Sequence, residues 1–104
     1  MSFNGNEGEF ITLEEGAAMT ARYRNSVQPG ETIAINFSKQ ILTEILNQDE
    51  CQSLRFYFAK NDEGKTNLVV TGVDNLGNDL YQGLVADRGG ICPPYCSGKN
   101  PLNS

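Results

Sequence analysis

The chain has 104 residues, of which 13 are acidic and 8 basic, and its formal net charge is −5. A chain of this length forms one domain and buries one core. The acidic balance argues against a phosphate-binding surface, so we expect no nucleic-acid partner and no membrane contact. The absence of histidine excludes His-based triads, proton shuttles and His-metal sites within one chain.

The start of the chain, residues 1–9, is rich in Gly, Asn and Glu, which predicts a flexible leader. It lacks the basic start and the apolar stretch of a signal peptide. No run in the sequence approaches the roughly 20 apolar residues that span a bilayer. We therefore expect a cytoplasmic protein in which residues 10–104 form a single α+β domain, ending in an extended tail at about 88–104.

Two helices are predicted in the first half of the chain. Thr12 and Glu15 make a capping box, in which each side chain satisfies a backbone N–H of the other residue, before a helix at about 13–25. Ser38 is the expected N-cap of a second helix at about 39–48, where apolar residues follow helical spacing.

Strands account for most of the remaining chain. Apolar residues alternate from Ile33 to Phe37 and again from Leu54 to Ala59, residues 66–73 are mostly apolar or β-branched, and a further strand is expected at about 79–86. The predicted fold is α+β, with the two N-terminal helices packed on an antiparallel meander sheet of three or four strands. The expected core consists of Leu13, Ala17, Ile41, Ile45, Leu54, Phe56, Phe58, Val70 and Leu84.

The tail concentrates the reactive side chains, because Cys92-Pro93-Pro94-Tyr95-Cys96 holds two of the three cysteines. The favoured interpretation is a docked strap, in which the prolines stiffen an extended segment and the cysteines act as small buried apolar residues. A disulfide is an alternative. Joining the two tail cysteines stabilises by about 2 kcal/mol, and joining Cys51 to either of them by about 4 kcal/mol.

Metal binding and redox catalysis are two further interpretations of the same cysteines. The spacing of Cys92 and Cys96 suits one arm of a zinc site, and Cys51 supplies a third thiolate, but the fourth ligand is missing. Thiol–disulfide catalysts place two residues between their cysteines at a helix N-terminus, whereas three residues intervene here and a coil follows. No metal or other cofactor is therefore expected, although the thiol site remains the alternative function.

A family resemblance is carried by the segment from Ala86 to Cys96, which follows the strand containing Leu54, Phe56 and Phe58. It resembles the corresponding part of a group of small uncharacterised bacterial proteins that end in the same cysteine pair around two prolines. The resemblance covers about residues 10–96 and implies a compact bacterial protein whose tail belongs to the domain. It implies no catalytic or binding residue, because the group has no established activity.

The sequence favours a small non-enzymatic interaction or accessory protein. The acidic surface, the absence of histidine and the lack of a cofactor motif or a convergent acid–base pair all argue against catalysis. The expected partner is another protein or a second copy of the chain. A free sheet edge or the Pro93-Pro94 tail is the expected contact.

Overall fold

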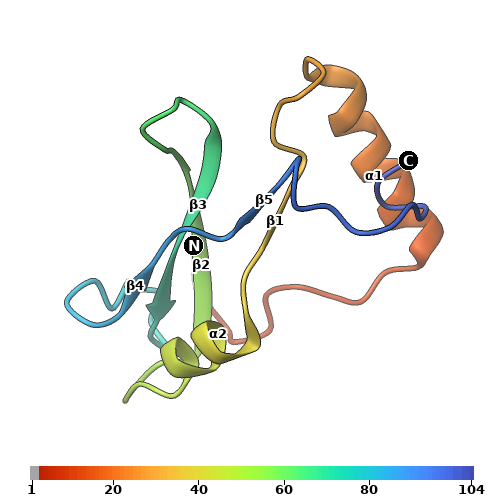
Figure 1. Cartoon of the computed structure of the whole chain (residues 1–104). Helices are drawn as coiled ribbons and strands as arrows, with labels where there is room; N and C mark the ends of the chain where they lie inside the picture. The colour runs from red at the N-terminus through yellow and green to blue at the C-terminus, as the bar shows by residue number, and fades with distance from the viewer. Residues whose placement is uncertain (1–2) are drawn as a thin grey trace.

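The structure is a computed structural model that describes residues 3–104, so the first two residues of the predicted leader lie outside the described residues. The α+β class is confirmed, because helices and two antiparallel sheets occur together (Figure 1). In chain order, the elements of the described residues are α1 (Leu13–Ser26), β1 (Ala34–Asn36), α2 (Lys39–Leu46), β2 (Ser53–Lys60), β3 (Thr66–Val73), β4 (Val85–Ala86) and β5 (Gly90–Cys92).

Both predicted helix starts are confirmed. At α1, the Thr12 hydroxyl accepts the Glu15 N–H at 3.1 Å, and the Glu15 carboxylate accepts the Thr12 N–H at 3.3 Å. At α2, the Ser38 hydroxyl accepts the Ile41 N–H at 3.1 Å. These caps satisfy backbone donors that have no partner inside the helix.

The larger sheet has the strand order β2-β3-β4 and is antiparallel throughout. β2 and β3 form a hairpin whose register runs from Ser53 opposite Val73 to Lys60 opposite Thr66. The predicted strand at 79–86 was too long, since it is reduced to β4 and an isolated bridge between Val73 and Asp79. The residues between them turn at Gly83, whose N–H donates to the Leu80 carbonyl at 3.0 Å.

The smaller sheet pairs β1 with β5 and lies between the larger sheet and α1 (Figure 1). Its register places Ala34 opposite Cys92 and Asn36 opposite Gly90. The two strands approach closely beside Gly89, where an added Cβ would lie 2.6 Å from Ile35 Cγ2 and 2.9 Å from the Asn36 carbonyl oxygen. The first strand of the chain is therefore paired with the tail and not with the meander.

The apolar core is small and lies where α2 meets β2 and β3. The buried apolar residues of the described chain are Ile45, Val70, Val73 and Cys92. Ile45 and Val70 are thus confirmed as core residues. Five other predicted core residues are exposed, because no part of the described chain covers them fully: Leu13, Ile41, Phe56, Phe58 and Leu84.

Candidate functional site

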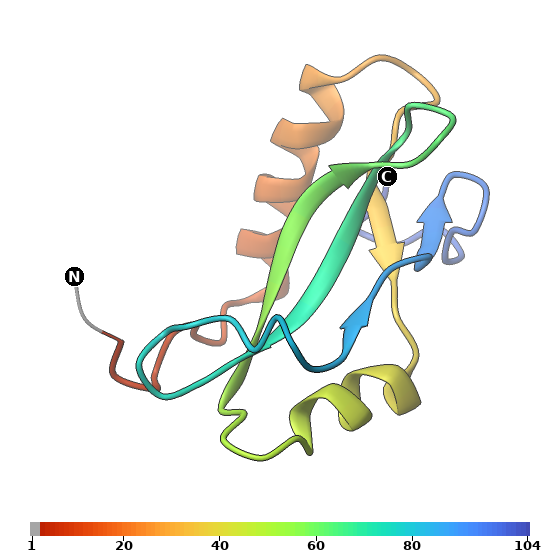
Figure 2. The ribbon, with the colours of Figure 1, turned by 90° about the vertical axis from the view of Figure 1, so that its left-hand side faces the viewer.

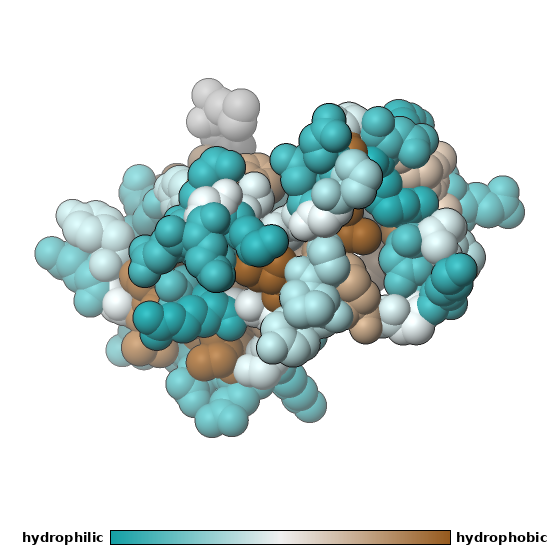
Figure 3. All heavy atoms as spheres, turned by 45° about the horizontal axis from the view of Figure 1, so that its top comes forward, coloured by the Kyte–Doolittle hydropathy of each residue, from teal (hydrophilic) through white to brown (hydrophobic). Residues whose placement is uncertain are grey.

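An apolar groove lies between α1, β1 and the β2–β3 hairpin. Its volume is about 300 Å³, and its lining includes Tyr23 from α1, Ile33 and Ile35 from the β1 segment, Phe58 from β2 and Leu68 from β3. Figure 3 shows apolar surface inside a hollow that is bordered by hydrophilic side chains. We call this feature the α1–β2 groove.

Two contacts position β1 at the base of the α1–β2 groove. The buried Thr32 hydroxyl donates to the Thr66 carbonyl at 2.8 Å, which ties the segment before β1 to β3. The Phe37 and Phe56 rings lie against each other with centroids 6.3 Å apart. β1 therefore shields part of the β2 face near Phe56, while the Phe58 side chain stays 87% exposed.

The helix that forms one wall of the groove is only lightly packed. α1 has no buried residue. Its most shielded side faces the C-terminal segment, where the Arg24 guanidinium donates to the Leu102 carbonyl at 2.8 Å and Leu102 lies beside Gly16. Met19 and Tyr23 are one turn apart and are both about half exposed. A second hollow of about 230 Å³ separates this part of α1 from β1 and the C-terminal segment.

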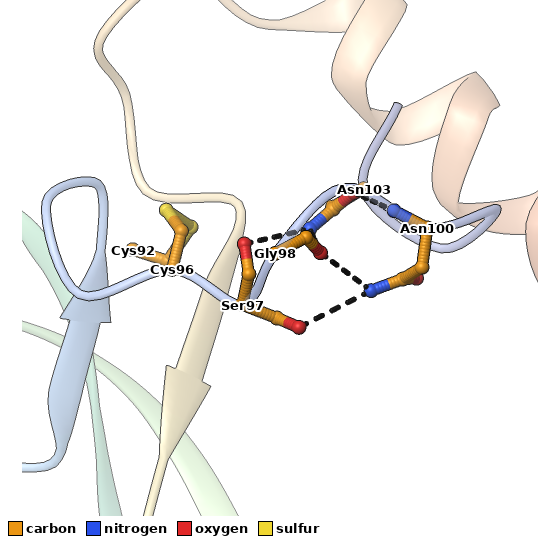
Figure 4. Close-up of a disulfide and its surroundings, with 6 residues drawn as sticks. All are labelled: Cys92, Cys96, Ser97, Gly98, Asn100 and Asn103. Carbon is orange, nitrogen blue, oxygen red and sulfur yellow. Dashed lines mark hydrogen bonds between the residues drawn. A yellow bond between two sulfur atoms is a disulfide. The ribbon is translucent and has the colours of Figure 1, made fainter.

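The two tail cysteines are brought together as a Cys92–Cys96 disulfide (Figure 4). The favoured expectation of free buried thiols was therefore wrong for this pair, because the chain between them turns back on itself. The Tyr95 N–H donates to the Ile91 carbonyl at 2.9 Å within that turn, and the Cys92–Pro93 and Pro93–Pro94 peptide bonds are cis. Cys92 is buried in β5, whereas Cys96 is exposed.

The residues after the disulfide fold into turns that pack beside α1 (Figure 4). The Asn103 side chain accepts the Asn100 N–H at 2.9 Å and donates to the Gly98 carbonyl at 3.1 Å. The Asn100 amide donates to the Ser97 hydroxyl at 3.3 Å. This network holds Leu102 against α1.

The third cysteine lies elsewhere in the molecule. Cys51 is a free thiol beside Ser53, and an added Cβ at Gly72 would lie 2.8 Å from its sulfur. The Cys51 side chain therefore lies against Gly72, near the end of β3. No group of three potential metal ligands occurs among residues 3–104. The structure thus joins Cys92 to Cys96 but does not gather all three cysteines around a common centre.

A polar cluster on the outer face of β2 was missed by the sequence analysis. The Arg55 guanidinium lies 2.6 Å from the Asp79 carboxylate and 3.1 Å from the Gly77 carbonyl, and the Tyr57 hydroxyl also donates to Asp79. Arg55 additionally stacks over the Phe3 ring, 5.5 Å from its centroid. The alternation of β2 places Arg55 and Tyr57 on one face, but no local pattern points to Asp79 as their partner.

These contacts shift the pKa of each polar member of the cluster. The hydrogen bond from Tyr57 and then that from Arg55 lower the pKa of Asp79, in spite of partial burial. The same carboxylate raises the pKa of Tyr57 and of Arg55, chiefly through these hydrogen bonds. The cluster holds the β3–β4 loop on the sheet through the contacts of Arg55 with Gly77 and Asp79.

The chain matches no protein-family model, no curated protein and no solved structure. Within residues 3–104, no helix has the length and apolar character needed to cross a membrane.

Proposed function

We propose that this protein is a small non-enzymatic interaction or accessory protein of the bacterial cytoplasm, and that another protein chain covers its α1–β2 groove. The supporting observation is the size of its surface. The accessible area is 8081 Å², about 2,300 Å² more than the roughly 5,800 Å² expected for a compact monomer of 11.4 kDa. The radius of gyration is 15.2 Å, against about 13 Å for a compact chain of this length.

The state of α1 supports the same proposal. A helix of 14 residues is marginal in water unless tertiary packing stabilises it. α1 contributes no buried side chain, and its exposed Tyr23 faces a hollow instead of a packed layer. In the assembled state we expect both helices to cover one face of the meander, with the partner filling the space between α1 and Phe58.

The chemistry of the groove favours a protein partner. Its lining is mostly apolar, and Phe58 and Tyr23 offer large aromatic surfaces of the kind that contribute strongly at protein interfaces. Burying a side chain such as Phe58 contributes about 1.5–3 kcal/mol. The net charge of −5 does not suit nucleic acid or an anionic membrane.

A photo-crosslinking experiment tests this function. Incorporating p-benzoylphenylalanine in place of Phe58, in cells that make the protein, should give a covalent protein adduct after illumination. The matched control carries the same group in place of Leu76, which is 73% exposed but lies outside the groove. Adducts from position 58 but not from position 76 are expected. No adduct at position 58, or equal labelling at both positions, would contradict the proposal.

The alternative function is thiol–disulfide exchange at the tail. One observation favours it: Cys96 is exposed while Cys92 is buried. An external thiolate would attack the Cys96 sulfur, form a mixed disulfide with it and release Cys92 as a thiolate. The reduction potential of the pair separates the two functions. If the disulfide is structural, its reduction potential should lie below about −300 mV. A reduction potential between about −270 and −120 mV would favour catalysis and would leave the disulfide reduced in the cytoplasm.

A further inference from the structure

The free edge of the larger sheet is formed by β2. The order β2-β3-β4 gives β2 only one neighbour. The Asn61 N–H donates to the Lys65 carbonyl, and bonded positions alternate along an antiparallel hairpin, so the odd-numbered residues of β2 are bonded to β3. The N–H and C=O groups of Phe56 and Phe58 therefore point away from β3, toward the free edge.

The centre of this edge, between Arg55 and Lys60, lacks the features that keep exposed edges from pairing. Natural edge strands are protected by charged residues, prolines, bulges or a covering segment. The stretch from Phe56 to Ala59 contains no charge and no proline and keeps regular pairing with β3. Tyr57 is 47% exposed and Phe58 is 87% exposed, so nothing in the described chain covers the centre of the strand.

We propose that β2 pairs antiparallel with β2 of a second copy of this chain, which joins two three-stranded sheets into one of six strands. The inference rests on the proposed function and names the partner that covers the groove. Outward-facing residues must pair with each other, and a two-fold axis at Tyr57 meets this requirement, because it places Phe56 opposite the partner's Phe58.

The charges of β2 fit this register. With the axis at Tyr57, Arg55 faces the partner's Ala59 and Lys60 faces the partner's Leu54, so no two positive charges lie opposite each other. Two aromatic pairs form on the groove side, one on each side of the axis. A cross-strand aromatic pair is among the stronger contacts that an antiparallel sheet makes.

The position of α1 agrees with a second copy at this edge. In the view of Figure 2, α1 projects on the β2 side of the hairpin and not on the β4 side, and Figure 1 shows that the smaller sheet lies between α1 and the hairpin. A strand added at β2 would therefore extend the sheet on the side of the molecule where the groove residues Phe58 and Tyr23 are exposed. The surface excess of about 2,300 Å² per chain is within the range that one chain buries in an obligate dimer, about 1,000–2,500 Å².

Light scattering after size-exclusion chromatography provides the first test. The unmodified protein should have twice its chain mass of 11.4 kDa, and Phe58→Asp should convert it to a monomer, because the dimer would bury the new charge. Leu76→Asp adds the same charge at a similarly exposed position outside the edge and should remain a dimer. A monomeric unmodified protein, or a Phe58→Asp dimer, would overturn the inference.

Disulfide trapping provides the second test and does not depend on the folding of Phe58→Asp. In a Cys51→Ser background, Tyr57→Cys places two thiols opposite each other at the axis, within the range for a disulfide, and should give a covalent dimer under mild oxidation. Leu76→Cys in the same background should not. If Tyr57→Cys stays monomeric, self-pairing at Tyr57 is wrong. Crosslinks from position 58 to a different protein would then keep the proposed function while excluding the second copy.

Discussion

The Asp79 carboxylate holds the β3–β4 loop on the outer face of β2. It accepts from Arg55 at 2.6 Å and from the Tyr57 hydroxyl, and these are side chains of two alternate positions on the strand. Arg55 also reaches the Gly77 carbonyl and the Phe3 ring. Arg55 of β2 thus connects the β3–β4 loop and the N-terminal segment. Among the described residues, Arg55–Asp79 is the sole ion pair.

The first prediction concerns the pH dependence that Asp79 confers. The pKa of Asp79 is lowered in the folded state. Its contribution to the free energy of unfolding is therefore fully present above the unfolded pKa of about 3.9, and it is lost as pH falls through the folded pKa. At pH 7, Asp79→Asn should lower the free energy of unfolding by up to about 1 kcal/mol, because the pair is partly exposed. In urea titrations at one protein concentration, the difference from the unmodified protein should shrink at strongly acidic pH. An equal difference at both pH values would contradict this role.

Among the secondary-structure elements, those set by local signals could be predicted from the sequence. The Thr12–Glu15 capping box placed the start of α1, and the alternation around Phe56 placed β2. The pairing of β1 with β5 joins residues more than fifty positions apart, and such pairing depends on tertiary packing that alternation does not encode. For the same reason the exposure of Phe58 and the partnership of Arg55 with Asp79 did not follow from the sequence.

Of the features described at the candidate site, only the tail cysteines were singled out from the sequence. Clustering in the sequence brought Cys92 and Cys96 to attention, and the structure joins them. The distance between Cys51 and the two tail cysteines depends on how the strands between them fold, and no local sequence pattern indicates it. No such pattern indicates the α1–β2 groove either, because the apolar residues that line it are of the same types as core residues. The suggestion that a free sheet edge makes the contact stays a prediction.

The second prediction tests the β1–β5 pairing at its closest approach. Gly89→Ala would place a Cβ 2.9 Å from the Asn36 carbonyl oxygen and 2.6 Å from Ile35 Cγ2. The backbone atom cannot move away without separating the two strands, so the free energy of unfolding should fall by about 1–3 kcal/mol. Gly98→Ala is the control, because no atom lies within 4 Å of its added Cβ. Equal stability of the two variants in thermal unfolding would show that the strands are not held together there.

At the scale of the whole molecule, the single chain leaves many large apolar side chains exposed. It buries few apolar side chains, and its large exposed side chains include Phe58, Tyr57 and Tyr23 around one groove and one sheet edge. Covering this surface with a second copy would supply the packing that α1 lacks and would pair the open edge of β2. The same contact would therefore account for the unprotected strand and the lightly packed helix.

Amide hydrogen exchange along β2 tests this account most directly. The Tyr57 N–H is bonded to β3 in the single chain and serves as the internal reference. The N–H groups of Phe56 and Phe58 point outward, so they gain a hydrogen-bond partner only if the edge is paired. We predict that all three amides exchange at similarly slow rates. Rapid exchange at Phe56 and Phe58 beside a protected Tyr57 would contradict the paired edge.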